Sequence, residues 1–107
     1  MSKSNNTTVI SGTQIKLNIH IDPLRGLHME MYDFECKFYI FPKRAIVLKK
    51  EDLVPVDQDN YLALIDTSDM GIGQLHLTLT AYIPDEDFET TRKEVVCVNT
   101  GINIINC

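Results

Sequence analysis

The sequence predicts an all-β protein, built as an antiparallel β-sandwich of six or seven strands. Two observations lead to this fold class. Apolar and polar residues alternate in several short segments, and turn-forming residues separate these segments roughly every 8–12 residues. In addition, no segment of about ten residues spaces its apolar side chains three and four positions apart, as an amphipathic helix would.

Strict alternation begins at Thr13 and continues to Ile21. The same period of two is present in residues 33–40 and 74–83, and it is typical of strands that bury one face. The inward positions of these three segments form the predicted core, which consists of Ile15, Leu17, Ile19, Phe34, Cys36, Phe38, Leu75, Leu77 and Leu79.

The remaining strand candidates are less regular. Residues 44–56 form either two short strands around a turn at Lys50-Glu51 or a helix of about two turns. Residues 61–66 predict a short strand. Residues 94–105 supply one strand, or two halves of a strand broken at Gly101.

The length of 107 residues is that of a single domain. Residues 1–8 are almost all polar, so we expect an N-terminal arm without a fold of its own, followed by one β-sandwich domain over residues 9–107. The N-terminus has no apolar stretch of a secretory signal, and no apolar run approaches the roughly 20 residues that span a bilayer. Unless a leader has been removed, the protein folds in a cytoplasm and has no membrane partner.

The charge balance argues against nucleic acid as a partner. The chain has 15 acidic and 10 basic residues, and its formal net charge is −5. A nucleic-acid-binding surface requires clustered Lys and Arg that displace counterions from the phosphates.

Gly71 and Gly73 form the only Gly-x-Gly pair of the chain. A phosphate-binding loop requires a helix after the glycines, but the residues after Gly73 alternate as a strand does. We therefore interpret both glycines as a structural turn between two strands, in which they supply positive φ angles. This interpretation predicts no nucleotide cofactor.

Candidate metal ligands are present but do not form a known pattern. His20 and His76 are predicted on the outer faces of their strands, where they come together only if those strands pair. The acidic turn at Asp57 and Asp59 resembles the start of a calcium loop, but Leu62 and Ser68 occupy the positions that require Gly and Glu in an EF-hand. We predict solvated carboxylates and no metal site, with a weak surface calcium site as the alternative.

We also predict no catalytic residues, and hence no enzyme. The serines lie in the N-terminal arm or in turns, so no Ser-His-Asp arrangement can be argued: they are Ser2, Ser4, Ser11 and Ser68. A pair of catalytic carboxylates would need a cleft, which a sandwich of this size rarely offers.

The three cysteines are Cys36, Cys97 and Cys107. Cys36 and Cys97 fall in strand segments, and we expect both to face inward as reduced, apolar thiols. A disulfide that links Cys36 to Cys97 across two sheets is the alternative, although the tryptophan that packs on such a bridge in immunoglobulin domains is missing.

Four segments carry a resemblance to a known family. They are "GTQIKLNIHI", "YDFECKFYI", the stretch from "IVLKKEDLVPV" to "AYIPDEDF", and "RKEVVCVNTGINI". Together they cover roughly residues 12–105, and their strands and turns resemble the small immunoglobulin-like domains of tailed-phage virions, chiefly of phages that infect gut Bacteroidales. The resemblance to the N-terminal domain of phage baseplate upper proteins is more distant.

This resemblance implies an immunoglobulin-like sandwich and a non-enzymatic virion structural protein that assembles in the host cytoplasm. Capsid decoration, head-fibre anchoring and a connector are the roles it implies, with sheet edges and the N-terminal arm binding other virion proteins in a homo- or hetero-oligomer. An adaptor in the tail or baseplate is the alternative, although the chain stops at Cys107 where baseplate proteins continue into a receptor-binding module. A small cytoplasmic metal-binding or enzyme module is the second alternative.

Overall fold

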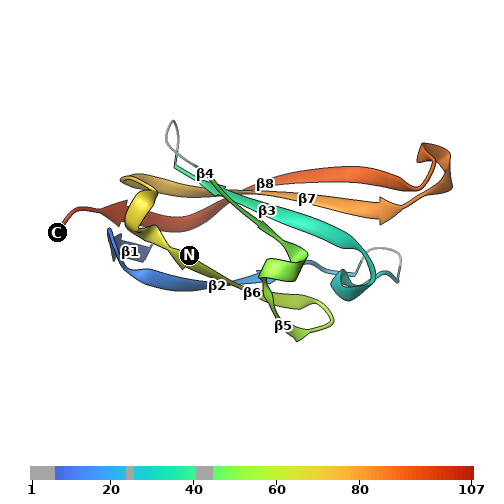
Figure 1. The fold of residues 1–107 in the computed structure, drawn as a ribbon, viewed down its shortest axis with the longest axis horizontal. Helices are drawn as coiled ribbons and strands as arrows, with labels where there is room; N and C mark the ends of the chain where they lie inside the picture. The colour runs from blue at the N-terminus through green and yellow to red at the C-terminus, as the bar shows by residue number, and fades with distance from the viewer. Residues whose placement is uncertain (1–6, 24–25, 41–44) are drawn as a thin grey trace, which may run out of the picture.

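The computed structural model describes residues 7–23, 26–40 and 45–107. These residues form an all-β protein in which two sheets pack face to face as a β-sandwich (Figure 1). The larger sheet has five strands in the order β1-β8-β7-β3-β4, and the smaller has three in the order β2-β6-β5. The strands are β1 (Thr7–Ile10), β2 (Gln14–His20), β3 (Asp33–Tyr39), β4 (Ala45–Lys49), β5 (Val54–Asp57), β6 (Asn60–Asp66), β7 (Gly73–Pro84) and β8 (Thr91–Ile105).

The described residues thus contain eight strands, where the sequence predicts six or seven. The additional strand is β1, which pairs in parallel with the end of β8, whereas all other pairs are antiparallel. Thr7 and Thr8 lie opposite Ile102 and Asn103, so the predicted boundary of the arm at residue 8 is wrong. A distant strand, not an apolar face, holds these two threonines in place. Residues 1–6 of the predicted arm lie outside the described residues.

The ambiguous segment 44–56 forms two strands and a short turn in its described part, and not a helix. Strand β4 belongs to the larger sheet and β5 to the smaller sheet. The short 3-10 turn η2 (Lys50–Asp52) lies between them, so the chain crosses from one sheet to the other at this edge of the sandwich (Figure 1).

The core lies between the two sheets and matches most of the predicted set. Seven of the nine predicted residues are buried, whereas Ile15 and Leu17 are only partly buried and pack against the core. Both belong to β2, an edge strand of the smaller sheet, where cover from neighbouring strands is incomplete. Ile40, which continues the alternation of residues 33–40, is also buried, whereas alternation alone does not mark Met29, Tyr61, Met70 and Ile104.

The glycine corner has the predicted geometry. Gly71 and Gly73 have φ angles of 93° and 136°, and β7 begins at Gly73, so a strand and not a helix follows the glycines. The turn before them is stabilised by Asp66, whose carboxylate accepts a hydrogen bond from the backbone N–H of Ser68 at 2.9 Å. The phosphate-loop alternative is therefore excluded on geometry.

Strands β7 and β8 form a hairpin that projects beyond the smaller sheet at one end of the molecule (Figure 1). Strand β8 is continuous through Gly101, whose positive φ of 79° accompanies a shift in its register with β7. Across the described ranges, no helix is long and apolar enough to cross a membrane.

Candidate interaction surface

His20 and His76, the two candidate metal ligands of the sequence, lie in different sheets. His20 is on β2 of the smaller sheet, where its Nε2 lies 2.9 Å from the Asp22 carboxylate. His76 is on β7 of the larger sheet and stacks on the Tyr39 ring at 5.5 Å between centroids. The hydrogen bond to Asp22 favours the protonated ring and raises the pKa of His20 above its ordinary value. The two strands do not pair, so the condition for bringing the two histidines together is not met.

The acidic turn after β5 uses its carboxylates within the fold. Asp57 accepts hydrogen bonds from the backbone N–H of Asp59 at 2.9 Å and from the Asn60 amide at 2.8 Å. The Asn60 amide is the main cause that lowers the pKa of Asp57. Asp59 in turn contacts His28 Nδ1 at 2.8 Å and accepts from the backbone N–H of Met29 at 3.2 Å.

These contacts hold the turn against the segment before β3. His28 makes one of them, although nothing in the sequence pattern marks this residue. Among the described residues, no group of three or more His, Cys, Asp and Glu side chains is arranged to hold a metal ion.

The cysteines are free, and their positions exclude the bridge between them. Cys36 on β3 is buried, and burial raises the pKa of its thiol to about 12. Cys97 on β8 is exposed, so the prediction that it faces inward is wrong. Strand β7 lies between β3 and β8 in the same sheet, and a Cys36–Cys97 disulfide would have to cross it.

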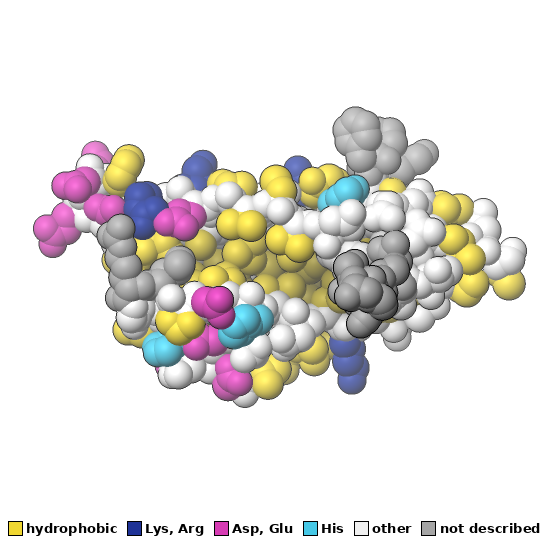
Figure 2. All heavy atoms as spheres, turned by 180° about the vertical axis from the view of Figure 1, so that it is seen from behind, with side chains coloured by type: hydrophobic (Ala, Val, Ile, Leu, Met, Phe, Trp, Pro, Cys, Tyr) yellow, Lys and Arg dark blue, Asp and Glu magenta, His cyan; other side chains and the backbone are white. Residues whose placement is uncertain are grey.

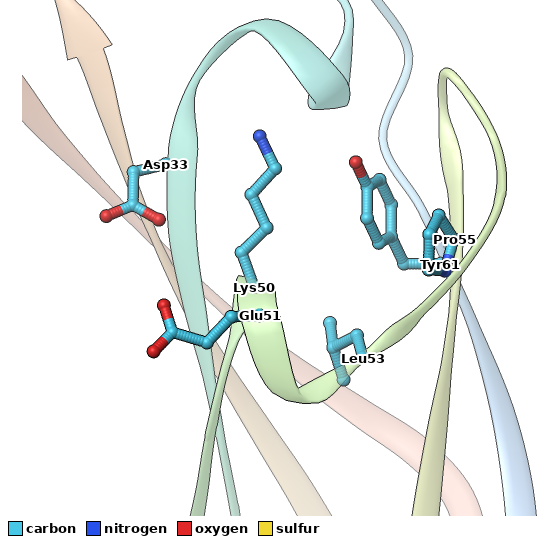
Figure 3. A pocket seen from close by; sticks show the side chains of 6 residues that line it. All are labelled: Asp33, Lys50, Glu51, Leu53, Pro55 and Tyr61. Atoms are coloured by element: carbon cyan, nitrogen blue, oxygen red, sulfur yellow. The ribbon is translucent and has the colours of Figure 1, made fainter.

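One edge of the sandwich is closed by the crossing at η2 (Figure 3). A shallow pocket of about 360 Å³ is present here, and the Lys50 side chain rises between Asp33 on β3 and Tyr61 on β6. Lys50 Nζ donates to the backbone carbonyls of Glu30 at 2.9 Å and Tyr32 at 2.7 Å. The ammonium group therefore links η2 to the segment that precedes β3.

The opposite edge is open as far as the described residues extend. Here a groove of about 360 Å³ runs between β2 of the smaller sheet and β7 and β8 of the larger one. Figure 2 shows its apolar floor, visible between the two layers of the molecule. We call this feature the open groove; its apolar side chains are Ile19, Ile21, Leu77, Leu79, Val96 and Val98.

The open groove exists because the two sheets differ in width. The smaller sheet ends at β2 and has no further described strand there. In the larger sheet, β8 extends past that edge, so no strand of the smaller sheet covers it. Val96 and Val98 on β8 are therefore 49% and 41% exposed, whereas Leu77 and Leu79 on the adjoining β7 are each 7% exposed. Over the described residues, β2 and the 91–101 part of β8 have no partner on their outer sides, so backbone N–H and C=O groups border the groove.

An acidic hollow adjoins the open groove at the turn end of the β7–β8 hairpin. Asp85, Asp87 and Glu94 line it, and among the described residues Arg92 supplies the one guanidinium. Arg92 Nε lies 3.1 Å from Asp85, and its Nη1 contacts Glu94. Figure 2 shows the acidic side chains gathered at this end of the molecule.

Comparison with protein-family models, with curated proteins and with solved structures returns no match. Sequence reasoning missed the open groove, although the run Val95-Val96-Cys97-Val98 was a signal for it. Four apolar residues in succession place apolar side chains on both faces of a strand, and at least one face then needs a cover.

Proposed function

We propose that this chain is a non-enzymatic, immunoglobulin-like virion structural protein of a tailed phage that binds other virion proteins through an open sheet edge. The observation that carries the proposal is the open groove, where two strand edges have no partner among the described residues and lie beside half-exposed valines. Free backbone groups next to apolar side chains are what β-strand addition by a partner protein uses.

The order of the strands supports the immunoglobulin-like part of the proposal. In that fold, strands C, F and G form one sheet and strands B, E and D belong to the other. The order β3-β7-β8 matches the first set and β2-β6-β5 matches the second, with β4 added beside β3 as in variable-type domains.

The virion setting comes from the resemblance of the strand and turn segments to phage immunoglobulin-like domains. Within a particle, the groove suits capsid decoration, head-fibre anchoring or a connector, because each of these roles consists of holding a neighbouring protein. The polar N-terminal arm is a second contact in this proposal. The engagement of Lys50, His28 and Asp57 in the fold's own hydrogen bonds favours a binding role over a catalytic one.

The proposal is tested by mass spectrometry of gradient-purified particles of the phage that encodes the chain. We expect the protein to co-sediment with the particles in a fixed ratio to the major capsid protein and to remain bound after washing with salt. Its presence only in the unassembled host-cell lysate would contradict the proposal.

A further inference from the structure

We infer that the open groove receives an extended segment of a different protein, which adds to β2 as a fourth strand of the smaller sheet. This inference rests on the proposed function, because it names the partner that the open edge binds. The segment has aliphatic side chains at alternate positions and basic residues at its N-terminal end.

The width of the sheets determines where such a strand fits. Neighbouring strands lie about 4.8 Å apart, and packed sheets lie about 10 Å apart. One strand beside β2 would therefore lie over the part of β8 that holds Val96 and Val98. Strand β2 has seven residues, so a segment of about that length matches its free edge.

The chemistry of the groove sets the side chains of the partner. Its inner surface is apolar in two rows of alternate residues, Leu77 and Leu79 on β7 and Val96 and Val98 on β8. An added strand directs every second side chain toward this surface and the others toward solvent. Alternating aliphatic and polar residues therefore fit, whereas a polar segment would leave the valines uncovered.

The charge at the end of the groove argues for a different protein and not a second copy of this chain. Strand β2 runs toward the acidic hollow, since Pro23 lines that hollow together with Asp85, Asp87 and Glu94. The chain itself carries a formal net charge of −5, so two copies repel each other on average. Arg92 pairs with Asp85 and Glu94, but the three carboxylates still exceed this one described guanidinium, so a Lys- or Arg-bearing end complements the remaining negative charge.

The direction of the added strand follows from the smaller sheet, in which both existing pairs are antiparallel. An antiparallel partner of β2 begins where β2 ends, beside the acidic hollow. The basic residues of the partner therefore belong at its N-terminus.

The test uses the full chain and a synthetic peptide in which two lysines precede seven residues of alternating valine and threonine. Binding is followed by NMR titration, and protection of the edge amides of β2 is followed by hydrogen exchange. Two peptides serve as controls: one has the valines placed in succession, and the other has the lysines at the C-terminus. We expect saturable binding that slows exchange along β2, at least about tenfold tighter than for either control.

Two chain variants localise the binding. Val96→Asp places a charge in the open groove, while Val47→Asp makes the same change at a valine of matching exposure on β4, 50% against 49%. We expect at least about a tenfold loss of affinity for Val96→Asp and none for Val47→Asp. If Val96→Asp fails to fold, Val96→Thr replaces it in the binding assay, because threonine keeps the shape of the valine side chain.

Several results would overturn the inference. One is the absence of binding at millimolar peptide, and another is equal affinity of the Val96 and Val47 variants. Dimers of the chain that bury β2 would make a second copy the occupant, and binding only after deletion of residues 1–6 would make it the chain's own N-terminus. The peptide assay uses no phage particle, so its failure does not contradict the proposed virion function. Conversely, absence of the chain from particles does not contradict a positive peptide result.

Discussion

The two long edges of the sandwich are built from similar strands but have opposite exposure. At the closed edge, the chain crosses from β4 to β5 through η2, and Leu53 just after that turn is only 5% exposed. At the open edge, the crossing from β1 to β2 is confined to one end, and Val96 farther along β8 is 49% exposed. The position of the crossing segment thus determines whether the apolar side chains between the two sheets are covered or stay exposed at that edge.

The largest effect expected from this comparison lies on the closed side. Phe34 is 1% exposed, and its ring meets that of Tyr61 edge to face at 5.2 Å between centroids. Phe34→Ala should lower the free energy of unfolding by about 3–5 kcal/mol, because it removes a buried aromatic ring and leaves a cavity. Urea denaturation measures this loss, and a change below about 1 kcal/mol would mean that the closed edge is not sealed.

A smaller effect is expected at the crossing itself. Lys50→Met keeps the aliphatic stem but removes the donor from the carbonyls of Glu30 and Tyr32. The free energy of unfolding should fall by about 1–2 kcal/mol, as when charged hydrogen bonds are lost. Lys49→Met is the control, since Lys49 is exposed on β4 and should change stability by less than about 0.5 kcal/mol. Equal losses in the two variants would show that the Lys50 contacts do not hold the edge.

At the open edge, truncation should cost the isolated domain little. Val96→Ala removes methyl groups that already contact water, so the expected loss of unfolding free energy is less than about 1 kcal/mol. Val47→Ala on β4 should give the same small value because its exposure is the same. A loss above about 2 kcal/mol for Val96→Ala alone would show that the groove is already filled in the free protein.

The smallest effect concerns pH at the rim of the open groove. The pKa of His20 is raised from 6.5 because Asp22 accepts a hydrogen bond from the protonated ring. The stabilising contribution of this pair is therefore fully present below pH 6.5 and disappears as the pH rises through the higher, folded-state pKa. NMR titration of the folded chain should give a midpoint above 6.5 that falls in the Asp22→Asn variant; an unchanged midpoint would show that the pair does not form in solution.

The same comparison shows what the sequence could predict. Strands with one polar face, such as residues 14–20 and 33–39, show alternation that predicts both the strand and its buried side. The Gly71 and Gly73 corner was also predictable, because positive φ angles favour glycine.

The orientation of β8 was not predictable from its pattern. Val95, Val96, Cys97 and Val98 are all apolar, so alternation gives no indication of which face is buried. This is why Cys97 was expected to face inward. Strand β1 was missed for a related reason, since Thr7 and Thr8 are held by a partner near the other end of the chain. The open groove depends on the number of strands in each sheet, which is set by long-range pairing and not by any local segment.

The central claim is that the open edge docks a virion protein while the closed edge does not. The most direct measurement is the copy number of Val96→Asp and Val47→Asp chains in particles assembled in cells that express only one of them, after both purified variants are shown to be folded. We predict that Val47→Asp is incorporated at the wild-type copy number and that Val96→Asp is reduced at least about tenfold, because a buried, unpaired carboxylate opposes docking. Incorporation of Val96→Asp at the wild-type copy number would contradict the claim.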